Sequence, residues 1–174
     1  MKTFIKANLM SLFLLIGLTG FSRLVAAGSF EQGMSAFQLG NYMAAFRIWT
    51  PLAKKGDALS QYNLGVMCYE GYGISQDYVE AAKWFHKAAV QKNADAQRNL
   101  GVMYYEGKGV SQDDVRAYMW FNRAVIYGSK EGIKDRNMIA KRMTFTQISE
   151  AQKLAREWST TQGSQEQRKN NVER

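Results

Sequence analysis

The sequence predicts an all-α fold, a right-handed α-solenoid of helix-turn-helix repeats with a period of 36 residues. Residues 58–93 and 94–129 align without a gap and are identical at 19 of 36 positions, so one structural unit occurs twice. The chain has one proline and nine each of tyrosine, phenylalanine and methionine, a composition that favours long, closely packed helices. With 174 residues, 46% of them hydrophobic and 22% charged, it can bury one core.

Residues 1–27 have the three parts of a secretory signal peptide. Lys2 and Lys6 precede the apolar run 9–21, and small residues lead to a preferred cleavage point after Ala27. The run is shorter than the roughly 20 residues that a membrane-spanning helix needs, so no stable span is expected after cleavage. We therefore expect an exported protein, in the bacterial periplasm or else extracellular. An uncleaved anchor is the alternative.

The repeat domain is expected over residues 28–158 and begins with a shortened unit at 29–57. At the same 36-residue offset, Tyr42 and Trp49 of this unit fall on aromatic residues of the next one. A tight Gly40-Asn41 turn replaces the longer loop of the full repeats. We interpret this unit as the N-terminal cap of the solenoid.

Each full repeat has the sequence signals of two helices joined by a glycine-containing loop. Aspartate or asparagine stands where each helix should begin, and glycine follows the first helix. The expected N-cap residues are Asp57 and Asp77 in the first copy, and Asn93 and Asp113 in the second. Tryptophan, phenylalanine and alanine recur at helical spacing in the second helix, which is typical of a close-packed core and not of a cofactor site.

The C-terminal part of the domain, residues 130–158, should form capping helices. The closing helix has a polar outer side, as a terminal unit requires. Its apolar face consists of Ile148, Ala151, Leu154, Ala155 and Trp158. Residues 159–174 contain almost no apolar side chains, so a disordered polar tail is expected there.

Charge and reactive residues argue against several functional classes. The formal net charge is +8, but no basic run with interleaved aromatic residues occurs, so nucleic-acid binding is not expected. His86 is the only histidine, and no metal-ligand spacing, nucleophile elbow or phosphate-binding loop is present, so no catalytic residue, metal or cofactor is expected. Cys68 is the only cysteine and is expected to be a buried apolar residue; an intermolecular disulfide is the alternative.

Nine residues recur at the same spacing in both copies. They are Ala58, Leu64, Gly65, Tyr69, Gly71, Gly73, Ala81, Trp84 and Ala88, repeated as Ala94, Leu100, Gly101, Tyr105, Gly107, Gly109, Ala117, Trp120 and Ala124. This pattern resembles the Sel-one-like repeat, a relative of the tetratricopeptide repeat. The resemblance implies an α-solenoid scaffold or adaptor, in many relatives an exported bacterial one.

The same resemblance raises two alternative functions. Cysteine-rich relatives are described as binding penicillin or hydrolysing β-lactams, which suggests a β-lactam- or peptidoglycan-directed hydrolase. Those relatives carry paired cysteines in each repeat, and this chain lacks the pairs. The other alternative is a secreted host-interaction factor.

A polar and methionine stripe on the first helices is the candidate binding surface. Its members are Asn63, Met67 and Glu70 in one copy and Asn99, Met103 and Glu106 in the other. First helices line the concave groove of tetratricopeptide-like solenoids, where asparagine can clamp the amides of an extended peptide and methionine gives adaptable apolar contact. Alternatively, each asparagine bonds neighbouring backbone and each glutamate caps a loop. Differences between the copies, such as Tyr72 against Lys108, are expected to tune the surface to one partner.

Overall fold

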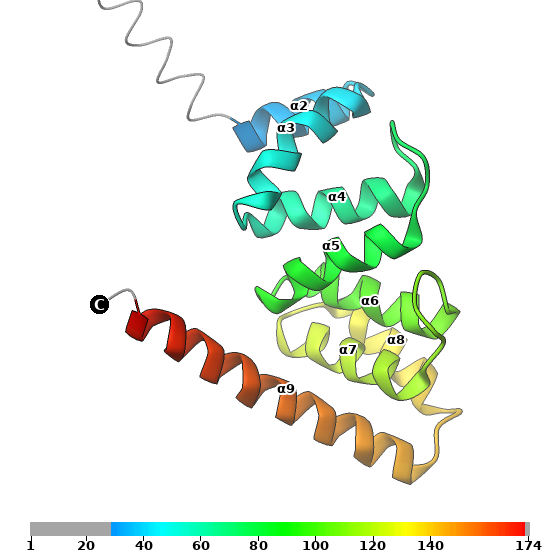
Figure 1. Cartoon of the computed structure of the whole chain (residues 1–174). Coiled ribbons are helices and arrows are strands. Elements are labelled where there is room, and N and C mark those ends of the chain that lie inside the picture. The colour runs from blue at the N-terminus through cyan, green and yellow to red at the C-terminus, as the bar shows by residue number, and fades with distance from the viewer. Residues whose placement is uncertain (1–28, 173–174) are drawn as a thin grey trace, which may run out of the picture.

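The computed structural model describes residues 29–172, and this part of the chain contains helices and no strands. The helices stack in sequence order, and the last one crosses the far end of the stack (Figure 1). They are α2 (Ser29–Gln38), α3 (Tyr42–Lys54), α4 (Ala58–Glu70), α5 (Tyr78–Val90), α6 (Ala94–Glu106), α7 (Asp114–Ile126), α8 (Lys130–Ala140) and α9 (Phe145–Val172). The predicted all-α repeat fold is confirmed, whereas the predicted signal peptide lies outside the described residues.

Successive helices pack as antiparallel neighbours from α2 to α8. Helices α4 and α5 form the first full repeat, and α6 and α7 form the second. Helix α4 is enclosed by α3 and α5 and also touches α6. Helix α9 leaves this order because it packs on α7 and not chiefly on α8. The first helices therefore have packed neighbours on several sides and expose only a narrow strip.

The helices begin at the residues that the sequence predicts. In each case a side-chain oxygen of the N-cap residue accepts a hydrogen bond from the backbone N–H three residues later, at 2.7–2.9 Å. The N-cap residues of α4 to α7 are Asp57, Asp77, Asn93 and Asp113. Each such cap satisfies one backbone donor at the helix start and is worth about 1 kcal/mol.

Within each repeat, an aromatic ring of the second helix packs directly on a glycine of the first. A Cβ atom added to Gly65 would lie 2.5 Å from the Phe85 ring, and one added to Gly101 would lie 2.5 Å from the Phe121 ring. Both rings are only 1% exposed. Glycine at this position therefore lets the two helices approach closely enough to exclude water from the ring.

Buried glutamines join successive units. Gln61 Nε2 donates to the carbonyl oxygen of Ala53 at 2.9 Å, and Gln97 Nε2 donates to that of Ala89 at the same distance. These carbonyls lie in the last turns of α3 and α5, where they also accept from the backbone N–H groups of Gly56 and Lys92 at 3.1 Å. The identical glutamines in the two copies therefore hold one repeat on the next.

Helix α9 confirms the predicted apolar face and corrects the predicted end of the ordered chain. Ala151 and Ala155 are buried, and the other members of the face pack against the core. The disordered tail expected over 159–174 is not what the structure shows, because α9 continues to Val172 and extends past the other helices (Figure 1). Glutamine, glutamate, arginine and lysine all favour a helix that the packed first half has already nucleated. Among the described helices, none is both long and apolar enough to cross a bilayer.

Candidate functional site

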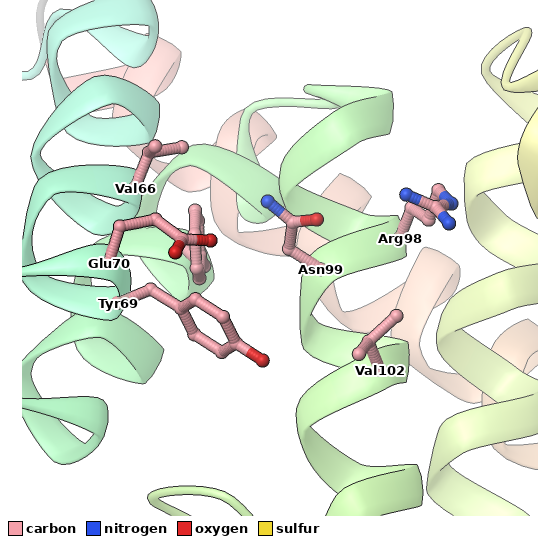
Figure 2. A pocket seen from close by; sticks show the side chains of 7 residues that line it. Val66, Tyr69, Glu70, Arg98, Asn99 and Val102 are labelled. Carbon is pink, nitrogen blue, oxygen red and sulfur yellow. The ribbon is translucent and has the colours of Figure 1, made fainter.

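A pocket of about 190 Å³ lies between α4 and α6, the first helices of the two full repeats. In Figure 2, Val66, Tyr69 and Glu70 project from α4 on one side, and Asn99 and Val102 come from α6 on the other. The full lining, called the α4–α6 pocket below, is Val66, Tyr69, Glu70, Phe85, Arg98, Asn99 and Val102. Apolar surface is combined there with a carboxylate, a carboxamide and a phenol, a mixture typical of ligand sites.

Two of the six residues predicted from the sequence, Glu70 and Asn99, meet in this pocket. They come from different repeats, because each unit places its asparagine beside the helix end of the unit before it. Asn63 lies in the equivalent position one unit earlier, where its Nδ2 contacts the Met34 sulfur at 3.8 Å. Asn63 therefore contacts the cap unit and does not line the α4–α6 pocket.

Met67 and Met103 were predicted to contact a partner, and the structure shows that this prediction is wrong. Both side chains are 0% exposed and belong to the core. Helices α4 and α6, which carry them, are packed on several sides. The residue that follows each valine of the exposed strip therefore already faces the interior. These methionines are identical in the two copies because they fill the core.

The Glu106 carboxylate is already bound by side chains of both repeats. Lys108 Nζ lies 2.9 Å from its carboxylate, and the Tyr69 hydroxyl donates to the same carboxylate at 3.2 Å. Lys108 also donates to the Tyr69 hydroxyl oxygen at 3.3 Å, and its hydrogen bond to Glu106 raises the pKa of the ammonium group. Glu106 therefore ties one repeat to the other. The expectation that the Tyr72 and Lys108 difference tunes the surface for one partner stays a prediction.

Five residues that line the pocket were not among the predicted site residues: Val66, Tyr69, Phe85, Arg98 and Val102. Val66 and Val102 are identical in the two copies and lie three residues after the two asparagines. The spacing i, i+3, i+7 from Asn63 through Val66 to Glu70 describes the exposed strip. The occurrence of valine at this position in both copies could have indicated from the sequence that the two residues belong to the site.

The electrostatics of the pocket leave its carboxylate uncompensated. Arg98 is paired with Asp135 of α8, Nε to Oδ2, at 2.6 Å. Burial raises the pKa of Tyr62, and a side-chain hydrogen bond with Asn99 partly opposes that rise. Among the described residues, the Glu70 carboxylate takes part in no ion pair or hydrogen bond.

Cys68 and His86 lie away from this pocket. The Cys68 side chain is 3% exposed, and burial raises the pKa of its thiol to about 11, so it is protonated and a poor nucleophile at neutral pH. The His86 ring packs edge-on against Trp158 and Trp120, with centroid distances of 5.3 and 6.0 Å, and burial lowers its pKa. Within residues 29–172, no three His, Cys, Asp or Glu side chains are grouped to hold a metal ion.

Comparison with known proteins identifies the repeat. The Sel1 repeat family matches residues 58–93 and 94–125. A putative sel1-like repeat-containing protein of Acanthamoeba polyphaga mimivirus is 46% identical over 41 residues, which are 24% of this chain and 7% of that protein.

Solved structures show the same architecture. A protective antigen present in uropathogenic Escherichia coli strains, which displays an SLR fold, superposes with a TM-score of 0.72 and 33% identity, covering 76% of this chain and 29% of that one. A Sel1 repeat protein from Oxalobacter formigenes gives 0.61 and 26%, covering 70% of this chain and 98% of that one. Cysteine-rich protein B of Helicobacter pylori, at 20% identity, a TM-score of 0.51 and coverage of 61% and 90%, shares the fold alone. Residues 58–93 and 94–125 of this chain are therefore two Sel1 repeats, and they lie inside an all-helical solenoid.

Proposed function

We propose that this chain is a scaffold whose α4–α6 pocket binds an extended segment of a partner protein. Sel1 repeat proteins are generally protein–protein interaction scaffolds, and the pocket is the specific observation that supports such a role here. Glu70 and Asn99 meet in it from consecutive repeats, beside Val66 and Val102. A partner segment lying there would contact both repeats at once.

The chemistry of Asn99 suits an extended backbone. A carboxamide offers two donors and an acceptor with two lone pairs. These groups can pair with one peptide N–H and one C=O. Val66 and Val102 supply apolar surface for a neighbouring side chain of the segment.

Photo-crosslinking tests this proposal. We expect a photoreactive residue at Val102 of the full chain to capture a partner in cells, whereas one at Gln152, an exposed residue of α9, captures none. The Asn99→Ala substitution should lower the yield of the Val102 adduct about threefold or more, because a net hydrogen bond is worth about 1 kcal/mol.

The matched control is Asn137→Ala, which removes an exposed asparagine of α8 outside the pocket. This variant should leave the Val102 adduct unchanged. Equal adducts from Val102 and Gln152, or an adduct unaffected by Asn99→Ala, would show that the pocket is not the binding site.

We further propose that the scaffold acts after export, most simply in the periplasm. The support is the order of Lys2 and Lys6, the apolar run 9–21 and the small residues up to Ala27. We expect intact-mass measurement of the periplasmic protein to give a chain that begins at Gly28. A mass that includes residues 1–27 would indicate a retained anchor, and recovery only from culture medium would favour the secreted host-interaction factor.

A further inference from the structure

The two repeats differ in the groups that surround the equivalent carboxylates of Glu70 and Glu106. In the second repeat, Glu106 is neutralised by Lys108 and receives the Tyr69 hydroxyl. In the first repeat, Glu70 occupies the equivalent position, is exposed and, within the described part of the chain, has no ion pair or hydrogen bond. One copy of the repeat thus contains an internal cation at this carboxylate, and the other does not.

Two substitutions between units explain the difference. The residue equivalent to Lys108 in the first repeat is Tyr72, whose ring stacks on Tyr42 at a centroid distance of 4.9 Å. The residue equivalent to Tyr69 in the cap unit is Gly33, which has no side chain and packs against Trp49. Both groups that bind Glu106 are therefore replaced at Glu70, by a tyrosine whose ring stacks on Tyr42 and by a glycine, and neither makes an ion pair or hydrogen bond with Glu70 in the described structure.

We infer that Glu70 receives a lysine or arginine side chain of the partner segment, so that the pocket selects a basic residue beside an apolar one. This inference rests on the proposed function. The Lys108–Glu106 pair shows within the same molecule how a cation occupies this position of the repeat. Val66 and Val102 provide the apolar contact next to the charge.

The cations around the pocket do not oppose this specificity. Arg98 is paired with Asp135 at 2.6 Å, and Lys108 is paired with Glu106 at 2.9 Å. Glu70 is then the uncompensated charge of the pocket lining. A negative charge beside apolar surface attracts a basic segment and disfavours an acidic one, which is how charge placement gives specificity at an interface.

A displayed library of random ten-residue peptides, selected on the purified full chain, tests the inference. We expect the wild-type chain to enrich peptides with lysine or arginine next to an apolar residue. In a selected peptide, changing that basic residue to glutamine should weaken binding about fivefold, the effect of one partly exposed ion pair. On the Glu70→Gln variant, the two peptides should bind within about twofold of each other.

Glu150→Gln is the matched control, because Glu150 is an exposed glutamate of α9 outside the pocket. It should preserve the wild-type preference for the basic peptide. An unchanged preference in Glu70→Gln, or an equal loss in Glu150→Gln, would overturn the inference.

The same selection separates this inference from the proposed function. Enriched peptides that lack basic residues, and whose binding is abolished by Val102→Glu, would overturn the role of Glu70 and leave the pocket as the binding site. Peptides that bind Val102→Glu as well as the wild type, or no enrichment at all, would overturn both.

Discussion

Replacing Gly109 with alanine is expected to lower the free energy of unfolding by about 3 kcal/mol or more. Gly109 has φ +70°, a conformation that a residue with a Cβ rarely adopts. The added Cβ would also overlap the carbonyl oxygen of Tyr78. Because Tyr78 begins α5, relief of this overlap requires the backbone of the Gly109 loop or of the α5 N-terminus to move. Urea unfolding followed by far-ultraviolet circular dichroism measures the loss.

Gly40→Ala is the control that separates backbone strain from the steric overlap. Gly40 has φ +76°, but an added Cβ would meet no atom within 4 Å. This substitution should therefore cost only the left-handed backbone penalty, about 1 kcal/mol. Equal losses in the two variants would mean that the close approach of the Gly109 loop to α5 contributes nothing to stability.

The Gly101→Ala substitution is expected to lower the free energy of unfolding by about 2 kcal/mol. In an exposed helix this change would be stabilising, because alanine has the higher helix propensity. Here the new Cβ would lie 2.5 Å from the Phe121 ring, which is 1% exposed and belongs to the packed core. The sign of the effect therefore reports the tight packing of α6 on α7. The same urea titration gives its size.

A double substitution checks that explanation. Phe121→Leu provides space for the new methyl group, so Gly101→Ala should cost less in that background than in the wild type. Asn137→Ala is the control, because Asn137 occupies the equivalent position in α8 and is exposed; this change should be neutral or slightly stabilising. Strictly additive losses from Gly101→Ala and Phe121→Leu would contradict a clash with the ring.

The elements of the fold that depend on local signals were predictable. The N-cap hydrogen bonds of Asp57 and Asn93 and the end of α4 at Gly71 follow from residue types at fixed offsets. The disordered tail was predicted incorrectly, because the absence of apolar residues removes tertiary packing but leaves helix propensity in place. Helix α9 continues to Val172 on that propensity.

The candidate site was predicted only in part. Glu70 and Asn99 lie in one pocket, but Met67 and Met103, placed on the same stripe, are buried. The spacing of residues along the sequence identifies which residues share a face of a helix. The number of helices packed around that helix decides how much of the face is exposed. The width of that strip distinguishes a partner contact from a core residue.

The sequence by itself determined the repeat, its 36-residue period, the helix starts and the aromatic residues of the core, because these depend on contacts close along the chain or repeated in each unit. Only the tertiary structure decided which member of each repeated pair is available to a partner. Glu70 and Glu106 occupy the same position of the repeat, yet Lys108 and Tyr69 bind one of them, whereas Tyr72 and Gly33, at the equivalent positions, leave the other open. The Lys108–Glu106 pair is local, whereas the Tyr69–Glu106 hydrogen bond joins two units, where residues far apart along the chain meet.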